Sequence, residues 1–411
     1  MKRTSCGAQP ASSPQVAVGA LSGTVHGGLH GSLPDALQRR IVAAVDDGVG
    51  SAIAACAVWP DGRVGGFAWG RTSRVRWCPA DTLAAGRHEP WTGSPIDLTT
   101  PFDLASLTKP IATTTLLAQL VGSGRLTLDT PLAALVPDAA TSPAARASLR
   151  QLLSHTSGWP AWHDYFAQTE AVPDGPERAA AVRKLVLATP LQRPAASTAV
   201  YSDLGFMALG WVVEAVGQHD LATQFARAVA EPLDVALAFA GQGNRQIGSC
   251  VATEIWAPRC ADGLPLLGSV HDDNCAALAG VAGHAGLFGS ALDVVKWAQC
   301  WLAAVGGTPN TLGLDASLAL DWTTAVAAAG SGWRLGWDTP TGPNSTAGDL
   351  APADTFGHLG FTGTSIWCST QQRSLFCLLT NRVHPSRTAV DGIKALRRDL
   401  HDGWWRAIRA I

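Results

Sequence analysis

The sequence predicts an α/β protein in which an antiparallel sheet, flanked by helices, is built from both ends of the chain. Short apolar runs that suit buried strands occur at 52–70 and again after about residue 333. The region between them shows helical periodicity and little strand character. We therefore expect one α/β core formed by the two chain ends, with a mostly helical lobe inserted in the middle.

The predicted domain organisation follows from this pattern. Residues 1–30 carry no clear helical or strand pattern, and we expect them to form a flexible tail. The remaining residues, 31–411, form one domain with an α/β lobe at about 31–105 and 295–411 and a helical lobe at about 106–294. With 411 residues, 47% of them hydrophobic, the chain is able to bury a large core.

The N-terminal elements begin with a helix at 33–45, whose apolar residues recur at helical spacing. The apolar run 52–58 suits a buried strand, and the turn signal Pro60-Asp61-Gly62 leads into a returning strand at 64–70. We expect the polar stretch 71–100 to be a loop or an insertion.

Helices in the middle of the chain and strands near its end complete the pattern. The expected helices lie at 149–159, 204–216 and 293–305, the expected strands at 332–337, 356–359, 363–369 and 375–380, and a last amphipathic helix at 390–411.

Composition excludes several classes of protein. The net charge of −2 leaves no broad basic surface for nucleic acid, and no apolar run reaches the roughly 18–20 residues of a membrane span. The N-terminus lacks an apolar signal region, so we expect a cytoplasmic protein, with a periplasmic location by another export route left open. Nine scattered cysteines form no metal-binding pattern, so we expect buried reduced thiols, no metal and no cofactor.

The first chemical motif is Ser106-Leu107-Thr108-Lys109, before the apolar run 111–121. At a helix start, Ser106 and Lys109 would lie on the same face. The Lys109 amine could then take the proton of the Ser106 hydroxyl. The free backbone N–H groups of the first helical turn could stabilise an oxyanion that forms when the serine attacks a carbonyl. Of the five lysines, only Lys109 has a serine three residues before it. The alternative is an ordinary serine and lysine on a helix. Because Pro110 disfavours a helical Lys109, we expect a partly irregular first turn.

Two further motifs add candidate residues. In Tyr201-Ser202-Asp203, a phenol near a lysine could be held as phenolate and act as a base, although Ser202 or Asp203 could simply cap the next helix. In His358-Leu359-Gly360-Phe361, the glycine would let a substrate backbone approach closely. Its alternative is a hairpin turn with an exposed histidine.

In this order and spacing, the three motifs resemble those of the penicillin-binding-protein and serine β-lactamase superfamily. The chain is most similar to the class C-like branch, which includes D,D-carboxypeptidases, D-aminopeptidases and carboxylesterases. The likeness runs from about residue 35 to 400. Further stretches that carry it are 152–158, 270–274, 280–288 and 379–385.

The resemblance implies a serine hydrolase that forms an acyl-enzyme on Ser106. Lys109 and Tyr201 would shuttle the proton, and the N–H groups of Ser106 and Phe361 would form the oxyanion hole. Asp203, His358 and Gly360 would line the substrate site. The substrates implied are peptidoglycan fragments or related small molecules, hydrolysed by D,D-carboxypeptidase or esterase chemistry. The alternatives are a true β-lactamase and a catalytically silent, penicillin-binding-like sensor or scaffold.

Two positions depart from the family pattern. Many members have Asn in place of Asp203 and Lys in place of His358. A carboxylate near Lys109 favours the ammonium form. We expect His358 to be mostly neutral at pH 7.5 and to bind substrate carboxylates better once it gains charge below pH 6.5. We expect a structural role for His284 and a turn-capping role for His155.

Overall fold

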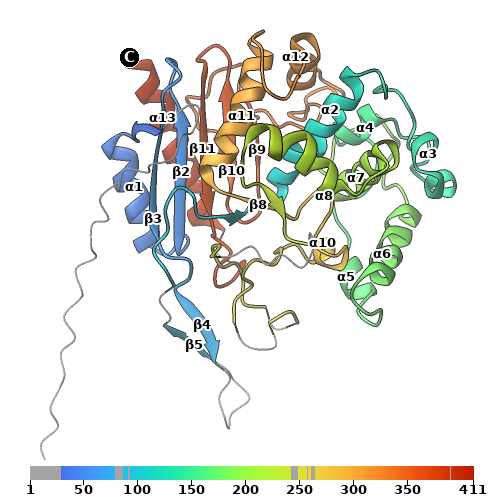
Figure 1. Ribbon diagram of the computed structural model, residues 1–411, viewed down its shortest axis with the longest axis horizontal. Helices are drawn as coiled ribbons and strands as arrows, with labels where there is room; N and C mark the ends of the chain where they lie inside the picture. The colour runs from blue at the N-terminus through green and yellow to red at the C-terminus, as the bar shows by residue number, and fades with distance from the viewer. Residues whose placement is uncertain are drawn as a thin grey trace, which may run out of the picture.

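The computed structural model describes residues 29–78, 87–90, 93–241, 249–256, 258–260, 264–388 and 390–411. A six-stranded sheet forms its centre, in the strand order β1-β3-β2-β11-β10-β9. Strands from both chain ends thus lie side by side, as predicted (Figure 1). The strands are β1 (Leu29–Ser32), β2 (Ala52–Val58), β3 (Val64–Gly70), β9 (Phe356–Leu359), β10 (Ser365–Ser369) and β11 (Ser374–Thr380).

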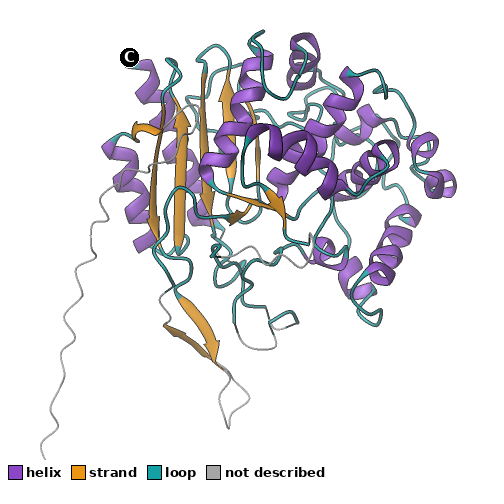
Figure 2. Cartoon of the chain, viewed as in Figure 1, coloured by secondary structure: helices purple, strands orange, loops and turns teal. Residues whose placement is uncertain are grey.

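The two faces of the sheet are covered by different helices (Figure 2). In β2, every residue is buried, and alternate side chains enter two separate cores. Ile53 and its same-face neighbours pack with α1 (Asp35–Asp46) and α13 (Asp391–Arg409). Ala54 and Cys56 face the core that includes α11 (Ala291–Val305). Burial on both faces explains why β2 is continuously apolar.

Tryptophans fill much of both cores, and three of them donate their indole N–H to a hydroxyl group. Trp297 and Trp301 on α11 both donate to Thr115 Oγ1, at 3.1 and 3.0 Å. On the other face, Trp404 Nε1 donates to Ser374 Oγ at 3.0 Å. These contacts satisfy the one polar atom of each large side chain, so the ring can be buried at little cost.

The middle of the chain is mostly helical, as predicted, and lies to the right of the sheet in Figure 1. Its α-helices are α2 (Thr115–Gly122), α3 (Leu132–Leu135), α4 (Leu149–Leu153), α5 (Tyr165–Gln168), α6 (Pro176–Ala188), α7 (Asp203–Gly217), α8 (Leu221–Phe225), α9 (Glu231–Leu233) and α10 (Asp273–Ala277), followed after α11 by α12 (Ala316–Thr324). Shorter 3₁₀ and π segments are η1 (Ala105–Leu107), η2 (Lys109–Thr114), η3 (Pro137–Thr141) and η4 (Ala226–Ala230). The lobe boundaries proposed from the sequence stay a prediction.

Several sequence expectations need correction. The predicted strand 332–337 is irregular, because Leu335 and Trp337 are buried by the core without a partner strand, and only Asp338 forms a bridge, to Gly357. The stretch 71–100, predicted as a loop or an insertion, contains two short antiparallel strands, which fits the insertion and not a plain loop. The sheet is not wholly antiparallel, because β1 and β3 run parallel.

The remaining strands form two small sheets. These strands are β4 (Val75–Cys78) with β5 (Arg87–Pro90), and β6 (Phe102–Asp103) with β7 (Ala238–Phe239) and β8 (Leu287–Gly289). The sheet of β6, β7 and β8 leads directly into η1, which carries Ser106.

Two further expectations can be compared with the structure only in part. The tail predicted at 1–30 lies almost entirely outside the described residues. Among the described residues, no helix combines the length and the apolar character that a membrane crossing demands. Burial raises the pKa of the Cys56 and Cys250 thiols to about 12 and about 11, which fits the expected buried, reduced cysteines.

Candidate active site

The first two motifs meet at the amine of Lys109. Its Nζ atom lies 3.0 Å from Ser106 Oγ, 2.6 Å from Tyr201 OH and 2.6 Å from Asp203 Oδ1. A fourth contact, of 3.3 Å, joins Nζ to the carbonyl oxygen of His284. The structure thus brings together side chains that are far apart in the sequence.

The segment around Ser106 is held in an uncommon conformation. Ala105 has a φ of 48°, in the left-handed region that side chains disfavour. The carboxylate of Asp103 accepts hydrogen bonds from the N–H groups of Ala105, at 2.8 Å, and His271, at 2.6 Å. Asp103, which sequence reasoning missed, therefore fixes the turn that presents Ser106.

Pro110 has the effect expected from the sequence. Ser106 lies in the 3₁₀ turn η1, and Lys109 begins the π-helical segment η2 before regular α-helix starts at Thr115. The irregular first turn still places Ser106 Oγ within hydrogen-bond distance of the Lys109 amine. The run 111–121 is apolar because most of it is buried in the core.

The buried amine of Lys109 keeps its proton. Burial by itself would lower the pKa, but Asp203 and Tyr201 outweigh it and raise the pKa of Lys109 above its usual 10.5. Burial also raises the pKa of Tyr201 to about 12, against the opposing effect of the Lys109 ammonium. The expected phenolate is therefore wrong for the resting site, where Tyr201 is a neutral phenol.

Of the two alternatives for Tyr201-Ser202-Asp203, the structure confirms the helix cap, at Ser202. Ser202 caps α7, because its side chain accepts a hydrogen bond from the N–H of Gly205. The backbone N–H of Ser202 in turn donates to His155 Nδ1 at 3.0 Å. His155, with a φ of 59°, thus does more than cap its own turn, because it fixes the segment that carries Tyr201.

His358 differs from expectation in two ways. It is buried, with 2% of its surface exposed, and its Nδ1 lies 2.7 Å from the carbonyl oxygen of Leu359. Burial, assisted by the Lys109 ammonium, lowers the pKa of His358 to about 3. The prediction that His358 gains charge below pH 6.5 is therefore wrong, and so is the alternative of an exposed histidine.

Gly360 is required by close packing against the Ser106 turn. A Cβ atom at this position would lie 2.0 Å from Thr364 Oγ1 and 2.7 Å from the carbonyl oxygen of Leu104. Only glycine therefore lets the end of β9 lie against η1. Phe361 follows directly, and within the described residues neither its backbone N–H nor that of Ser106 donates a hydrogen bond.

An open cleft of about 730 Å³ contains these groups. Its lining is mostly apolar, and three aromatic side chains contribute to it, Trp162, Trp333 and Phe361. The sequence-predicted residues on its wall are Ser106, Tyr201, Asp203, His358, Gly360 and Phe361. Among the described residues, no group of His, Cys, Asp or Glu side chains is arranged to hold a metal ion.

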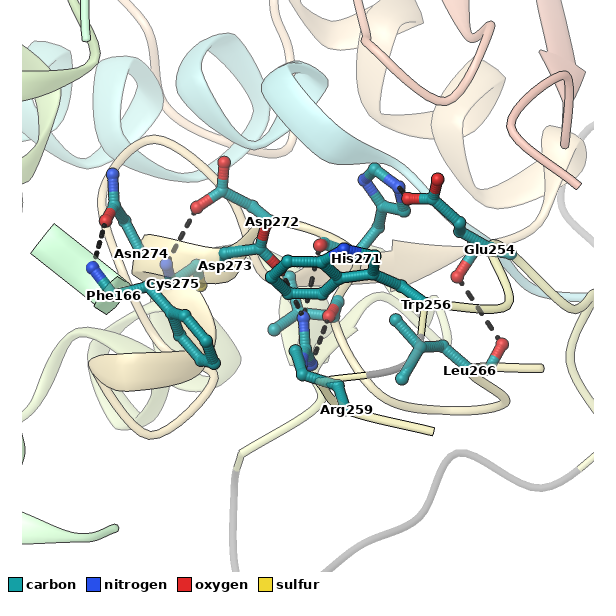
Figure 3. Close-up of polar contacts among 12 residues, drawn as sticks. Phe166, Glu254, Trp256, Arg259, Leu266, His271, Asp272, Asp273, Asn274 and Cys275 are labelled. Carbon is teal, nitrogen blue, oxygen red and sulfur yellow. Dashed lines mark hydrogen bonds and ion pairs between the residues drawn. The ribbon is translucent and has the colours of Figure 1, made fainter. Parts of the chain in front are cut away.

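A network of charged residues that the sequence did not reveal contributes His271, Asp273 and Arg387 to one wall of the cleft. Figure 3 shows part of this network. Glu254 accepts from Arg387 Nε at 2.5 Å and lies 3.0 Å from His271 Nε2. Arg259 Nη1 donates to Asp273 at 3.2 Å. The only sequence signal for this network is the stretch 270–274, which carries part of the family likeness.

This network contacts Phe361, whose N–H is predicted to form part of an oxyanion hole. The imidazole of His271 stacks on the Phe361 ring at 5.6 Å, and the Arg382 guanidinium lies over the same ring at 4.3 Å. The network of Glu254 thus holds His271 against the ring of Phe361. His284 has the structural role predicted for it, because its Nε2 lies 3.0 Å from Asp272 Oδ1 and its carbonyl accepts from Lys109.

Comparison with known proteins agrees with this geometry. The sequence model of the Beta-lactamase family matches residues 39–399. The chain belongs to the beta-lactamase family. A relative from Escherichia coli (strain K12), named "Putative D-alanyl-D-alanine carboxypeptidase", is 30% identical over 309 residues, which cover 69% of this chain and 70% of the relative. Membership of the beta-lactamase family makes the protein a serine hydrolase.

Solved structures of other proteins share the fold. EstCE1, a hydrolase with promiscuous acyltransferase activity, aligns with a TM-score of 0.68 and 19% identity, covering 90% of this chain and 98% of its own. A class C beta-lactamase from Rhodobacter sphaeroides aligns with a TM-score of 0.63 and 15% identity, covering 90% and 99%. These likenesses confirm the predicted fold class.

Proposed function

We propose that the protein hydrolyses small peptide or ester substrates related to peptidoglycan fragments, through an acyl-enzyme on Ser106. D,D-carboxypeptidase or esterase chemistry fits best. The observation that carries the proposal is the contact of Ser106 Oγ with the Lys109 amine, which itself contacts Tyr201 and Asp203. The name of the relative from Escherichia coli supports the same direction.

The proton of Ser106 needs an acceptor in this cluster. The Lys109 ammonium and the neutral phenol of Tyr201 already carry their protons, so neither can accept another one. Asp203 is the anionic neighbour, 2.6 Å from Nζ. Lys109 therefore takes the Ser106 proton as it passes one of its own to Asp203, and Ser106 Oγ attacks the substrate carbonyl.

The leaving group then receives a proton from Tyr201. Tyr201 recovers one from Lys109, and Lys109 recovers one from Asp203, so the site returns to its resting charges. The N–H groups of Ser106 and Phe361 stabilise the oxyanion of the tetrahedral intermediate, because neither donor is used by another group of the described residues. Water hydrolyses the acyl-enzyme along the same path in reverse.

A silent sensor or scaffold would not require this cluster. A buried ammonium, phenol and carboxylate around a serine are costly to fold and have no packing advantage over apolar residues. The test is covalent labelling with a fluorophosphonate or a fluorescent penicillin. We expect label on the native protein and on Ser197→Ala, which alters an exposed serine, and none on Ser106→Ala.

Turnover is tested with two substrates. Release of D-alanine from a peptide ending in D-alanyl-D-alanine reports carboxypeptidase activity, and release of p-nitrophenol from a small ester reports esterase activity. Retention of both activities in Ser106→Ala would contradict the proposal. Loss of the fold in Ser106→Ala would also contradict it, because a serine in a helical turn contributes only about 1 kcal/mol to the free energy of unfolding.

A further inference from the structure

His271 contacts both segments that carry the expected oxyanion donors. Its backbone N–H donates to Asp103 Oδ2 at 2.6 Å, and Asp103 Oδ1 accepts from the N–H of Ala105, next to Ser106, at 2.8 Å. Its imidazole stacks on the ring of Phe361, with 5.6 Å between the centroids and 25° between the planes. One residue thus touches the turn that presents the Ser106 N–H and the residue that carries the other N–H.

The turn after β9 rests on Asp103 as well. Thr362 Oγ1 donates to the carbonyl oxygen of Asp103 at 2.8 Å. Phe361 precedes Thr362 in this turn, but Phe361 is 51% exposed, so burial does not fix its ring. The ring instead packs against His271 and against the Arg382 guanidinium, which lies 4.3 Å from its centroid. The orientation of Phe361 therefore depends on how firmly these two neighbours are held.

Glu254 fixes the imidazole of His271. Glu254 Oε2 lies 3.0 Å from His271 Nε2, and Figure 3 shows the ring turned toward this carboxylate. Burial alone would raise the pKa of Glu254, but hydrogen bonds from His271 and Arg387 outweigh it and lower the pKa below the usual 4.5. An ionised carboxylate only accepts hydrogen bonds, so His271 Nε2 carries a proton and donates it. The two side chains are only 5% and 6% exposed, so water competes little for this contact.

Glu254 is itself held by several neighbours. Arg387 donates to its carboxylate twice, from the backbone N–H at 3.0 Å and from Nε at 2.5 Å. The carbonyl oxygen of Glu254 accepts from the N–H of Leu266 at 3.0 Å. Arg259 Nη1 donates to the carbonyl oxygen of His271 at 3.2 Å, which fixes the backbone beside the ring. An apolar residue in place of Glu254 would avoid the cost of desolvation, but it could not orient the imidazole.

We propose that His271 and Glu254 are positioning residues for the oxyanion hole. Glu254 orients the His271 ring, and the ring holds Phe361 in place relative to the Ser106 turn, which the His271 backbone also fixes through Asp103. The two N–H donors are then placed before the reaction begins, so they need not reorganise as the oxyanion forms. Neither side chain transfers a proton in this role. The inference rests on the proposed function, because it assigns the residues that prepare the site for the tetrahedral intermediate.

His271→Ala removes the ring and keeps the backbone N–H that binds Asp103. Because a displacement of about 1 Å can cost about 100-fold in rate, we expect kcat on the p-nitrophenyl ester to fall by about 10- to 100-fold. Glu254→Gln keeps the size of the side chain but has one acceptor oxygen in place of two, so it should show a smaller loss. Both variants act through one contact, so the double variant should lose little more than His271→Ala.

Two binding measurements separate positioning from contact with the substrate. Phenylboronic acid adds to a serine hydroxyl and becomes tetrahedral, so one of its oxygens occupies the oxyanion position. Its affinity should fall in His271→Ala by about the same factor as kcat. The affinity of Ser106→Ala for a D-alanyl-D-alanine peptide, measured by calorimetry, should be the same in Ser106→Ala/His271→Ala. An equal loss of peptide affinity would mean that His271 contacts the substrate, and it would overturn the proposal.

His163→Ala is the matched control for the ring. His163 is exposed, does not line the cleft, and lies 5.3 Å from the Tyr165 ring, so the variant removes a similar contact elsewhere. Glu214→Gln is the control for the carboxylate, because Glu214 is partly buried and accepts from the N–H of Leu221 at 3.2 Å, outside the cleft lining. Both controls should keep the native kcat and the native affinity for phenylboronic acid.

Hydrogen exchange tests the positioning without turnover. In the turn 360–364, the N–H of Gly360 donates to the carbonyl oxygen of Thr364 at 2.7 Å, so it exchanges slowly while the turn is held. We expect faster exchange in this turn for His271→Ala and Glu254→Gln than for the native protein and the two controls. Unchanged exchange would overturn the proposal.

Exchange also separates this inference from the proposed function. If the native protein shows no Ser106-dependent turnover, the proposed function fails, and exchange still decides whether His271 holds the turn. Ser106-dependent turnover that is unchanged in His271→Ala leaves the proposed function standing and overturns the positioning role. If His271→Ala does not fold, Glu254→Gln carries the same comparison.

Discussion

The ammonium of Lys109 and the carboxylate of Asp203 form an ion pair of 2.6 Å directly beside the hydroxyl of Ser106. The lysine is fully buried, and the aspartate is 16% exposed. An asparagine at position 203 could still contact the amine but would not stabilise its charge. The carboxylate therefore sets the protonation of Lys109, and with it the path that the Ser106 proton takes.

Asp203→Asn should destabilise the protein. Removing one partner of a buried ion pair typically costs about 3–5 kcal/mol, because the remaining charge is left without compensation. The folded-state pKa of Lys109 is raised, so this stabilisation is fully present below the unfolded pKa of 10.5 and is lost as pH rises through the folded value. We expect the gap in unfolding free energy between native and variant to be large at pH 8 and smaller at pH 11.

Urea unfolding followed by circular dichroism measures this gap. Asp234→Asn is the matched control, because Asp234 is almost fully exposed and lies 4.0 Å from Lys296. An exposed pair of this kind should show no measurable loss. Equal effects of the two substitutions would mean that the Lys109–Asp203 pair does not stabilise the fold.

Tyr201→Phe and Lys109→Ala should each reduce kcat/KM strongly, by about 10²–10⁴-fold, the range typical of a lost general acid or base. The two side chains lie 2.6 Å apart and belong to one proton path, so the double variant should lose little more than either single one. Steady-state kinetics on the p-nitrophenyl ester measures all three. Losses that multiply would show that the two residues act separately.

Strands and motifs could be predicted from the sequence because their signals are local. The bounds predicted for β2 and β3 match the structure, since an apolar run and a Pro60-Asp61-Gly62 turn lie within neighbouring residues. The strand predicted at 332–337 is wrong because strand pairing there does not depend on local sequence. Its apolar residues face the core individually, and no adjacent strand pairs with them.

Protonation states could not be predicted, because they depend on burial by distant parts of the chain. His358 was expected to titrate near pH 6.5, yet it is enclosed beside Lys109 and its pKa falls to about 3. Tyr201 was expected as a phenolate, yet burial raises its pKa to about 12. Glu254 and Asp103 were missed because a glutamate or aspartate becomes notable only when its neighbours are known.

His358 should make the protein sensitive to acid. The unfolded chain takes up a proton at this histidine below pH 6.5, whereas the folded protein does so only near pH 3. Its contribution to stability is therefore full above pH 6.5 and is lost as pH falls, by about 1.4 kcal/mol per pH unit. When the pH is lowered from 7.5 to 5.0, the unfolding free energy of His358→Gln should fall by about 2 kcal/mol less than that of the native protein.

Thermal or urea unfolding at the two pH values checks the acid sensitivity. His219→Gln is a suitable control, because His219 is exposed and does not line the cleft, and this variant should behave like the native protein. If His358→Gln and the native protein lose the same free energy on acidification, His358 titrates normally in the folded state.

The last prediction concerns β-lactams. An asparagine at position 203 could donate its N–H to the acylamide carbonyl of a penicillin, whereas the ionised Asp203 can only accept hydrogen bonds and repels that carbonyl. Without the carboxylate, burial lowers the pKa of Lys109, so its amine can take the Ser106 proton directly and no longer needs Asp203 as the acceptor. We therefore expect slow acylation of the native protein by fluorescent penicillin and faster acylation of Asp203→Asn, with Asp273→Asn, also on the cleft wall, as the control. His358→Lys should not help, because it would bury a second ammonium near Lys109. Efficient penicillin hydrolysis by the native protein, with kcat/KM near about 10⁷–10⁸ M⁻¹s⁻¹, would contradict this role of Asp203 and favour a true β-lactamase.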